Sequence, residues 1–253
     1  MHVPATRVIE APLIEVFSSL QGEGVLIGAR QIFVRFAECN LDCAYCDTPF
    51  QPQATCRIET MPGNAEFVSH ENPVDLRKIT RLVSEWQKNY HNFHHSVVLT
   101  GGEPLLHAGV LKEWLPEIKP LVPVFLETNG TLTAELEMIL PLVDMVSMDV
   151  KGSSTTGMVT PWAEHARFMA LANERLCQVK LVVDATTSDE EVLQAAVLVH
   201  EYASAAPFIL QPRTTAAGPV PNGRVLLKLQ QIAAAKHHDV RIIPQVHPLL
   251  GVA

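Results

Sequence analysis

The sequence predicts an α/β fold in which parallel strands alternate with helices around one sheet. Seven short apolar runs rich in β-branched residues recur along the chain. Continuous apolar runs of this length are typical of parallel strands that are buried on both faces. Amphipathic segments lie between the runs, which is the pattern of right-handed βαβ units. The alternation alone leaves open whether the sheet is doubly wound or forms a closed or partial barrel.

In chain order, the predicted strands are residues 32–37, 96–100, 122–127, 145–149, 179–183, 208–211 and 240–243. The predicted helices are residues 74–88, 105–118, 134–142, 189–202 and 224–237, which carry apolar side chains at helical spacing. The clearest helix start follows Ser188, where three acidic residues favour the positive end of the helix dipole. Residues 50–73 are rich in Pro, Gln and Asn and show little periodicity. We interpret them as an irregular insertion within a single domain that spans residues 1–253.

Composition and charge exclude several classes of protein. The chain has 253 residues, of which 47% are hydrophobic and 18% charged, an ordinary globular composition that excludes a disordered chain. Its formal net charge of −8 argues against a protein that binds nucleic acid or an anionic membrane surface. No secretory leader and no apolar stretch of membrane-spanning length are visible. We therefore expect a cytoplasmic protein that binds neither nucleic acid nor membrane.

Polar and glycine residues follow most of the predicted strands. These segments are residues 38–39, 100–104, 127–130, 149–151 and 211–214. In α/β sheets and barrels, the groups that perform chemistry lie just beyond the carboxyl ends of the strands. The sequence therefore predicts a functional site at one rim of the sheet.

Three of the five cysteines are clustered directly after the first predicted strand, as Cys39-x3-Cys43-x2-Cys46. This clustering favours a metal site in a reducing compartment over a disulfide framework. Three thiolates leave one coordination position open. A remote histidine or Cys56 would complete a structural zinc site, or the segment would be a compact knot without metal, whereas a 4Fe-4S cluster would keep its fourth iron open for a ligand. The spacing favours the cluster, and Cys56 and Cys177 are then incidental thiols.

The cysteine motif, with Tyr45 before its last cysteine, resembles the signature of the radical S-adenosylmethionine (SAM) superfamily. The segment Thr100-Gly101-Gly102-Glu103-Pro104 is similar to the glycine-rich SAM motif of that superfamily, in which glycines let the backbone approach the cofactor. The resemblance implies a partial (β/α) barrel of the radical SAM type. It also implies a 4Fe-4S cluster on Cys39, Cys43 and Cys46, with SAM bound to the open iron.

A closer resemblance, to the 7-carboxy-7-deazaguanine synthases, extends from Ile14 to Ala253 and is weakest over residues 50–73. Its motifs are residues 18–24, 33–36, 39–48, 127–130, 149–151, 210–212 and 241–247. It implies a lyase that converts 6-carboxy-5,6,7,8-tetrahydropterin to 7-carboxy-7-deazaguanine with loss of ammonia, in queuosine and 7-deazapurine biosynthesis. SAM would be cleaved to a radical that removes a hydrogen from the pterin and would then be regenerated. The resemblance further implies Mg²⁺ bound by Thr48, a homodimer, and an external electron donor such as flavodoxin.

The same resemblance assigns roles to individual residues and places no catalytic residue beyond the cluster and SAM. The expected substrate-binding residues are Leu20, Gln21, Gly22, Arg35, Thr100, Glu127, His247 and, through its terminal carboxylate, Ala253. The expected SAM-binding residues are Gly101, Gly102, Glu103, Asp149, Val150, Lys151, Gln211, Pro212, Arg213 and Thr214. An unpaired buried guanidinium is costly, so Arg35 must face a carboxylate, either of the protein or, as the resemblance favours, of the substrate.

Two other functions remain as alternatives. The first is another small radical SAM enzyme, such as a glycyl-radical activating enzyme, although no second set of clustered cysteines is present. The second is a zinc-stabilised module without catalysis. This hypothesis does not explain the Gly101-Gly102-Glu103 segment or the polar residues at the strand ends. Arg35 and the Gln21-Gly22 segment favour the synthase.

Overall fold

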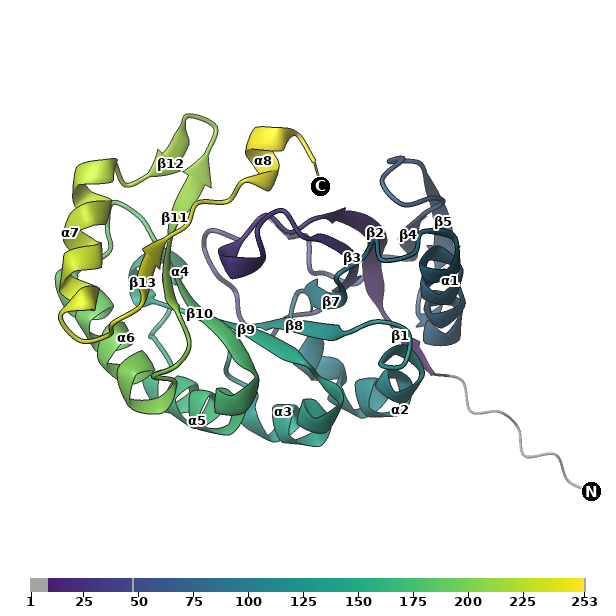
Figure 1. Ribbon diagram of the computed structural model, residues 1–253, viewed down its shortest axis with the longest axis horizontal. Coiled ribbons are helices and arrows are strands. Elements are labelled where there is room, and N and C mark those ends of the chain that lie inside the picture. The colour runs from purple at the N-terminus through teal and green to yellow at the C-terminus, as the bar shows by residue number, and fades with distance from the viewer. Residues whose placement is uncertain (1–8, 47, 253) are drawn as a thin grey trace, which may run out of the picture.

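The computed structural model describes residues 9–46 and 48–252, and its main feature is one curved sheet of eleven strands. Six neighbouring strands are mutually parallel: β3 (Arg30–Phe36), β7 (Ser96–Gly101), β8 (Val124–Thr128), β9 (Met145–Val150), β10 (Leu176–Val183) and β11 (Phe208–Thr215). A seventh, β13 (Val240–Ile242), pairs in parallel with β11. All seven predicted strands are therefore confirmed. The sheet curves without closing, as Figure 1 shows, so the partial barrel is confirmed as well.

Helices cover the outer face of the curved sheet (Figure 1). The predicted ones are α1 (Leu76–Asn89), α2 (Ala108–Ile118), α3 (Thr133–Ile139), α6 (Asp189–Tyr202) and α7 (Gly223–Ala234). Helix α6 begins as predicted, because the Ser188 side chain accepts a hydrogen bond from the Glu191 amide. Helix α5 (Trp162–Ala172), which packs against α3 and α6, is not predicted from the sequence. The main core lies between these helices and the sheet.

Residues 50–73 are not irregular, contrary to the sequence interpretation. They contain the antiparallel strands β4 (Thr55–Glu59) and β5 (Phe67–Glu71), and β4 joins the sheet beside β2 (Leu13–Leu20). Strand β2, also unpredicted, runs antiparallel to β3. The hairpin lies at the sheet edge with many side chains in solvent, so it lacks the continuous apolar run of a central strand.

The remaining elements are short. They are strands β1 (Glu10–Ala11), β6 (Val74–Asp75) and β12 (Gly218–Val220), helices α4 (Ser153–Thr156) and α8 (His247–Leu250), and four single turns of 3-10 helix. In Figure 1, α8 lies near the inner side of the sheet, opposite the outer helices. No helix in the described part of the chain is long and apolar enough to cross a membrane.

Along the strands, the side chains on the inner face of the sheet change from apolar to polar, and the site lies at the polar end. Phe33, Val98 and Phe125, on three neighbouring strands, form a small apolar cluster with Phe17 on the inner face. Side chains two residues apart on a strand share a face. The next inward positions towards the carboxyl ends are therefore Arg35, Thr100 and Glu127. The inner face is apolar at its base and polar at the rim where the sequence predicts chemistry.

Candidate active site

A cavity of about 480 Å³ lies at this polar rim. Most of the predicted site residues line it, together with others that the sequence did not indicate. The predicted residues in its wall are Leu20, Gln21, Gly22, Arg35, Cys39, Cys43, Cys46, Thr48, Thr100, Gly101, Gly102, Glu127, Asp149, Lys151, Gln211, Arg213, Thr214 and His247. The fold therefore brings the proposed substrate and cofactor residues to one cavity, from segments that span most of the chain.

Four predicted residues are not in the described cavity wall. Ala253 lies outside the described residues. Val150, the last residue of β9, is 1% exposed and belongs to the main core, because its side chain points to the opposite face of the sheet from that of Asp149. Pro212 is also buried and does not line the cavity. The Glu103 side chain is fully buried behind the glycine loop. The side chains of Val150, Pro212 and Glu103 are therefore not placed to contact SAM directly.

Glu103 instead holds two loops together. Its carboxylate accepts hydrogen bonds from the Thr128 hydroxyl and from the Asn129 amide, the latter at 2.8 Å. Burial raises its pKa to about 7, against the effect of these donors. The residue thus connects the loop after β7 to the loop after β8.

The glycine loop is shaped by the cysteine loop. Gly101 has φ +115°, and a Cβ at Gly102 would lie 1.8 Å from the Glu38 carbonyl oxygen. The Gly102 amide donates to the Phe36 carbonyl at 2.9 Å, and the Glu103 amide donates to the Glu38 carbonyl at 2.8 Å. Both glycines are therefore required for the close approach of two backbones, in addition to lining the cavity.

The three clustered cysteines line one wall of the cavity as free thiols. Burial raises the pKa of Cys43 to about 11 and that of Cys39 above its usual value. A bound metal centre would reverse this, because coordination favours the thiolate. Over residues 9–46 and 48–252, no three His, Cys, Asp or Glu side chains are gathered for a single metal ion. Cys56 lies fully buried in the core on β4, so it offers no fourth zinc ligand here.

Neighbouring elements hold the cysteine loop from one side. The Ala44 amide donates to the Thr156 carbonyl of α4 at 3.0 Å, and the Lys151 ammonium donates to the Tyr45 hydroxyl at 2.9 Å. Helix α4 is itself fixed by Glu191, which accepts hydrogen bonds from Ser153 and Ser154. Burial raises the pKa of Tyr45 to about 12, so the phenol remains protonated.

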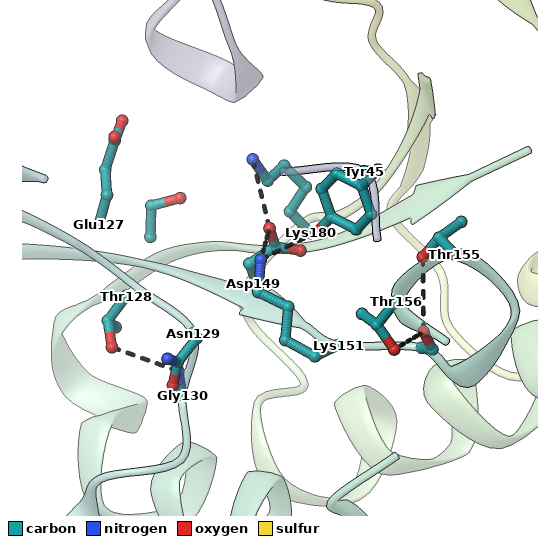
Figure 2. A network of polar contacts seen from close by, with 12 residues as sticks. Tyr45, Glu127, Thr128, Asn129, Gly130, Asp149, Lys151, Thr155, Thr156 and Lys180 are labelled. Carbon is teal, nitrogen blue, oxygen red and sulfur yellow. Dashed lines mark hydrogen bonds and ion pairs between the residues drawn. The ribbon is translucent and has the colours of Figure 1, made fainter. Parts of the chain in front are cut away.

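Charged side chains of alternating sign cross the cavity wall between β9 and β10 (Figure 2). Lys151 donates to Asp149 Oδ2 at 2.8 Å, and Lys180 Nζ lies 3.7 Å from the same oxygen. Lys180 also forms an ion pair with Glu23. Burial acts to lower the pKa of both lysines, but the carboxylates outweigh it and raise both pKa values. The lysines therefore stay charged.

Glu23 and Glu127 occupy different electrostatic environments in the same cavity. Burial opposes ionisation of Glu23, but Lys180 outweighs it and holds the pKa at about 2. Burial and the neighbouring Glu23 raise the pKa of Glu127. Glu127 accepts hydrogen bonds from Gln21 Nε2 and from the Thr100 hydroxyl, each at 2.8 Å. Three predicted substrate residues are thus joined in one polar group.

Arg35 has a carboxylate partner within the protein and also lines the cavity. Its Nε donates to Glu15 Oε1 at 3.1 Å, so it has a structural carboxylate. Its guanidinium also packs over the Phe17 ring, with Cζ 5.6 Å from the ring centroid. The residue nevertheless lines the cavity with about a quarter of its side chain exposed, which leaves a charged face towards a ligand.

The C-terminal segment folds back onto the loop after β2, as the sequence resemblance implies. The Val246 amide donates to the Gly22 carbonyl at 2.9 Å, and Gln245 Nε2 donates to Glu23 Oε1 at 2.6 Å. His247 lies against Gly22 so closely that a Cβ there would be 2.0 Å from the imidazole Nδ1. This contact explains the glycine and brings His247 into the cavity wall.

The donor and acceptor chemistry of the cavity fits the expected cofactors. Asp149 Oδ1, Gln211 Oε1 and Thr214 Oγ1 are buried without a hydrogen-bond partner among the described residues. Unsatisfied buried acceptors beside a cavity call for a ligand with hydroxyl or ammonium donors, and SAM carries both. Three thiols on the neighbouring wall supply soft ligands for iron. The residues present therefore fit a 4Fe-4S cluster and SAM.

Sequence reasoning missed several residues of the wall, above all Glu23, Lys180 and Gln245. Lys180 carried a signal comparable to that of Arg35, since it is a lone charge in the apolar strand β10. Glu23 and Gln245 lie within the matched segments 18–24 and 241–247 but were given no role, because their place in the site depends on loops whose path the sequence pattern does not specify.

Comparisons with known proteins agree with this geometry. The radical SAM superfamily matches residues 34–201. The chain therefore belongs to the radical SAM superfamily. A 7-carboxy-7-deazaguanine synthase of Geobacter sulfurreducens is 44% identical over 95% of this chain and 97% of its own length. The synthase of Methanothermobacter thermautotrophicus is 33% identical over 96% of this chain and 98% of its own length. The chain is thus a member of the 7-carboxy-7-deazaguanine synthase family.

Solved structures support the fold. The crystal structure of QueE from Escherichia coli has a TM-score of 0.54 at 20% identity and covers 94% of both chains. Streptococcus suis SuiB bound to S-adenosylmethionine has a TM-score of 0.53 at 15% identity, covering 84% of this chain and 51% of SuiB. At these identities the likeness concerns the fold, which is the partial barrel described above.

Proposed function

We propose that this chain is a radical SAM lyase that converts 6-carboxy-5,6,7,8-tetrahydropterin to 7-carboxy-7-deazaguanine with loss of ammonia. The observation that carries the proposal is one cavity with three clustered thiols on one wall and Gln21, Arg35 and Glu127 on another. Identity of 44% to a synthase over nearly the whole chain supports the same reaction. The product would enter the biosynthesis of queuosine and related 7-deazapurines.

The substrate residues divide by the chemistry of the pterin. Glu127 would accept N–H groups of the amino-pyrimidinone edge, with Gln21 and Thr100 fixing its two oxygens. Arg35 would bind the substrate carboxylate, and Thr48 would ligate a Mg²⁺ that polarises the same group. Leu20 and Gly22 would complete the loop over the ring. His247, held against Gly22, would close the cavity on the remaining side, and the family resemblance alone supports a substrate contact for Ala253.

The cofactor residues lie on the opposite wall. Cys39, Cys43 and Cys46 would hold the cluster, which with SAM supplies one-electron chemistry and abstraction of a substrate hydrogen. The backbone at Gly101 and Gly102 and the acceptors of Asp149, Gln211 and Thr214 would bind SAM. Lys151 and Arg213 would supply positive charge beside it. Glu103, Val150 and Pro212 would contribute by shaping the loops and through their backbone.

We also propose a homodimer that receives electrons from an external donor such as flavodoxin. Resemblance to the family supports both statements. A cytoplasmic location is proposed because thiol-ligated iron and a low-potential electron donor require a reducing compartment.

Anaerobic reconstitution tests the proposal. We expect about four irons and four sulfides per chain, and new deazapurine mass and absorbance when the protein is incubated with the carboxytetrahydropterin, SAM, Mg²⁺ and reductant. A triple Ser variant of Cys39, Cys43 and Cys46 should lose both iron and product, whereas Cys177→Ser should lose neither. Cluster binding without deazapurine would favour another radical SAM reaction, and one tightly held zinc with no iron would favour the non-catalytic module.

A further inference from the structure

A buried series of polar contacts crosses the cavity from the C-terminal segment to the cysteine loop. Its members, in order of contact, are Gln245, Glu23, Lys180, Asp149, Lys151 and Tyr45. The charged members alternate in sign. The charged side chains are only 12–21% exposed, so solvent screens them weakly.

Lys180 is the only member of this series that contacts both walls of the cavity. Its ammonium pairs with Glu23, which belongs to the loop after β2, and approaches Asp149 on the neighbouring strand β9, as Figure 2 shows for Asp149. Glu23 accepts from Gln245 through its other oxygen. The C-terminal segment therefore contacts the sheet through Glu23, which pairs with Lys180 on β10 and is also hydrogen-bonded to Gln211 on β11.

The charge of Lys180 also limits repulsion within the cavity. Without it, Glu23 would lose its paired ammonium and would face the negative charges of Asp149 and Glu127, while Asp149 would keep Lys151 as its partner. Buried carboxylates that lose their counter-charge either take up a proton or move towards solvent. Movement would release the hydrogen bond that Glu23 accepts from Gln245, and protonation would weaken it because the acceptor would lose its charge.

We propose that Lys180 is a positioning residue for the proposed reaction, joining the loop 21–23 and the C-terminal segment 245–250 to the wall formed by Asp149 and Lys151. The inference rests on the proposed function for its kinetic consequence. Its structural consequence, the docking of the C-terminal segment, is independent of that function. Lys180 need not touch the reacting atoms, because it acts through Glu23 and Asp149.

Three variants of the reconstituted enzyme test this role. Lys180→Met removes the ammonium, Lys180→Arg keeps the charge, and the double variant Glu23→Gln with Lys180→Met removes a balanced pair. Lys228→Met is the matched control, because Lys228 is 60% exposed and pairs with Asp189 between two surface helices. Hydrogen–deuterium exchange of peptides covering residues 243–252 and 40–48 is measured with thermal unfolding and steady-state kinetics.

We expect Lys180→Met to raise the amide exchange rate of the 243–252 peptide about tenfold or more. It should also lower kcat/KM on the order of 100-fold, which is the usual consequence of misplacing a site by about 1 Å. Lys180→Arg should recover slow exchange and most of the activity. The double variant should recover thermal stability but not the slow exchange of the 243–252 peptide. This result would show that Lys180 positions the C-terminal segment and does more than balance charge. Lys228→Met should resemble the wild type in every measurement.

The proposal is wrong if folded Lys180→Met, or the folded double variant where Lys180→Met does not fold, exchanges the 243–252 peptide at the wild-type rate. It is equally wrong if the double variant recovers both stability and kcat/KM. Should the wild type form no deazapurine, the proposed function fails, and the exchange rates alone still decide whether Lys180 docks the C-terminal segment.

Discussion

Two groups of alternating charges lie at the open side of the sheet, and they differ mainly in how far their cationic side chains are exposed to water. The inner group is Glu23, Lys180, Asp149 and Lys151 in the cavity wall. The outer group is Glu15 with Arg35 and Arg57, on the neighbouring strands β2, β3 and β4. The inner side chains are at most 21% exposed, whereas Arg57 is 58% exposed.

The comparison shows that the loss of an ion pair has different consequences for stability when the paired side chains differ in solvent exposure. In the inner group, each charge depends on its partners because water reaches it only in part, so removing one member leaves a poorly compensated charge. At Arg57, the most exposed member of the outer group, water and salt can replace a lost partner. Arg35 lies between these extremes, since it belongs to the outer group but lines the cavity.

The largest effect is expected for Asp149→Asn, which removes the carboxylate that two buried ammonium groups share. Breaking a buried ion pair costs about 3–5 kcal/mol, so the free energy of unfolding measured by urea denaturation should fall by about that amount. Asp189→Asn is the control, because Asp189 is 45% exposed and pairs with a surface lysine. A loss below about 1 kcal/mol in Asp149→Asn would place the inner group in the same class as the outer one.

Arg35→Lys should have an intermediate effect that appears in binding more than in stability. Lysine keeps the charge but not the planar fork that matches a carboxylate. A hydrogen bond to a charged group is worth about 1.5–3 kcal/mol, so KM for the pterin should rise about 10- to 100-fold. Arg57→Lys, the matched change on the next strand, should leave KM unaltered. If Arg35→Lys lowers stability and leaves KM unchanged, Glu15 is the residue's real partner.

A pH effect should arise beside the inner group, at His165. Its Nδ1 donates to the Gly130 carbonyl and its Nε2 accepts from the Lys151 amide, so a proton on Nε2 would break the second hydrogen bond. Burial lowers its pKa from 6.5 to about 4. Between these values the unfolded chain binds a proton at His165 that the folded chain does not, so the stability that His165 contributes should fall as the pH falls from about 6.5 to about 4, whereas Glu103, whose pKa burial raises to about 7, acts in the opposite direction.

Unfolding free energies measured across that range test the effect at His165. His165→Gln should flatten the dependence, and the exposed His91→Gln controls for loss of an imidazole at the surface. An unchanged slope in His165→Gln would mean that another group, such as the buried His94, whose pKa is also about 4, accounts for the acid sensitivity.

The smallest effect is expected for Arg57→Ala. Arg57 donates to Glu15 at 2.8 Å and covers the Phe67 ring, with Cζ 4.5 Å from its centroid, but more than half of the side chain is exposed. Exposed ion pairs contribute about 0–1 kcal/mol, so the free energy of unfolding should change by less than about 1 kcal/mol. A loss comparable to that of Asp149→Asn would mean that depth does not separate the two groups.

The cofactor wall could be predicted from the sequence much better than the substrate wall. Cys39, Cys43 and Cys46 lie within one short segment, and the glycine loop follows the next predicted strand, so local spacing identifies both. The reason for the glycines was only partly predicted, since Gly102 is required by the Glu38 carbonyl of the cysteine loop. For Glu103 the predicted side-chain contact with SAM was wrong, because a motif marks a position in the chain but does not specify where its side chain points.

The charge series shows why the rest could not be predicted. Lys180 meets Asp149 because β9 and β10 pair in a register that places the two residues side by side. It meets Glu23, 157 residues away in sequence, because the loop after β2 reaches across the cavity. Neither contact leaves a periodic pattern in the chain.

By itself, the sequence determined the central parallel strands, most of the outer helices and the cysteine motif, because each depends on residues close together along the chain. Only the tertiary structure decided that residues 50–73 add a hairpin to the sheet and that Glu103 faces away from the cavity. It alone also connects Lys180 to the C-terminal segment. Strand register and loop path bring distant residues together, and these depend on packing over the whole molecule.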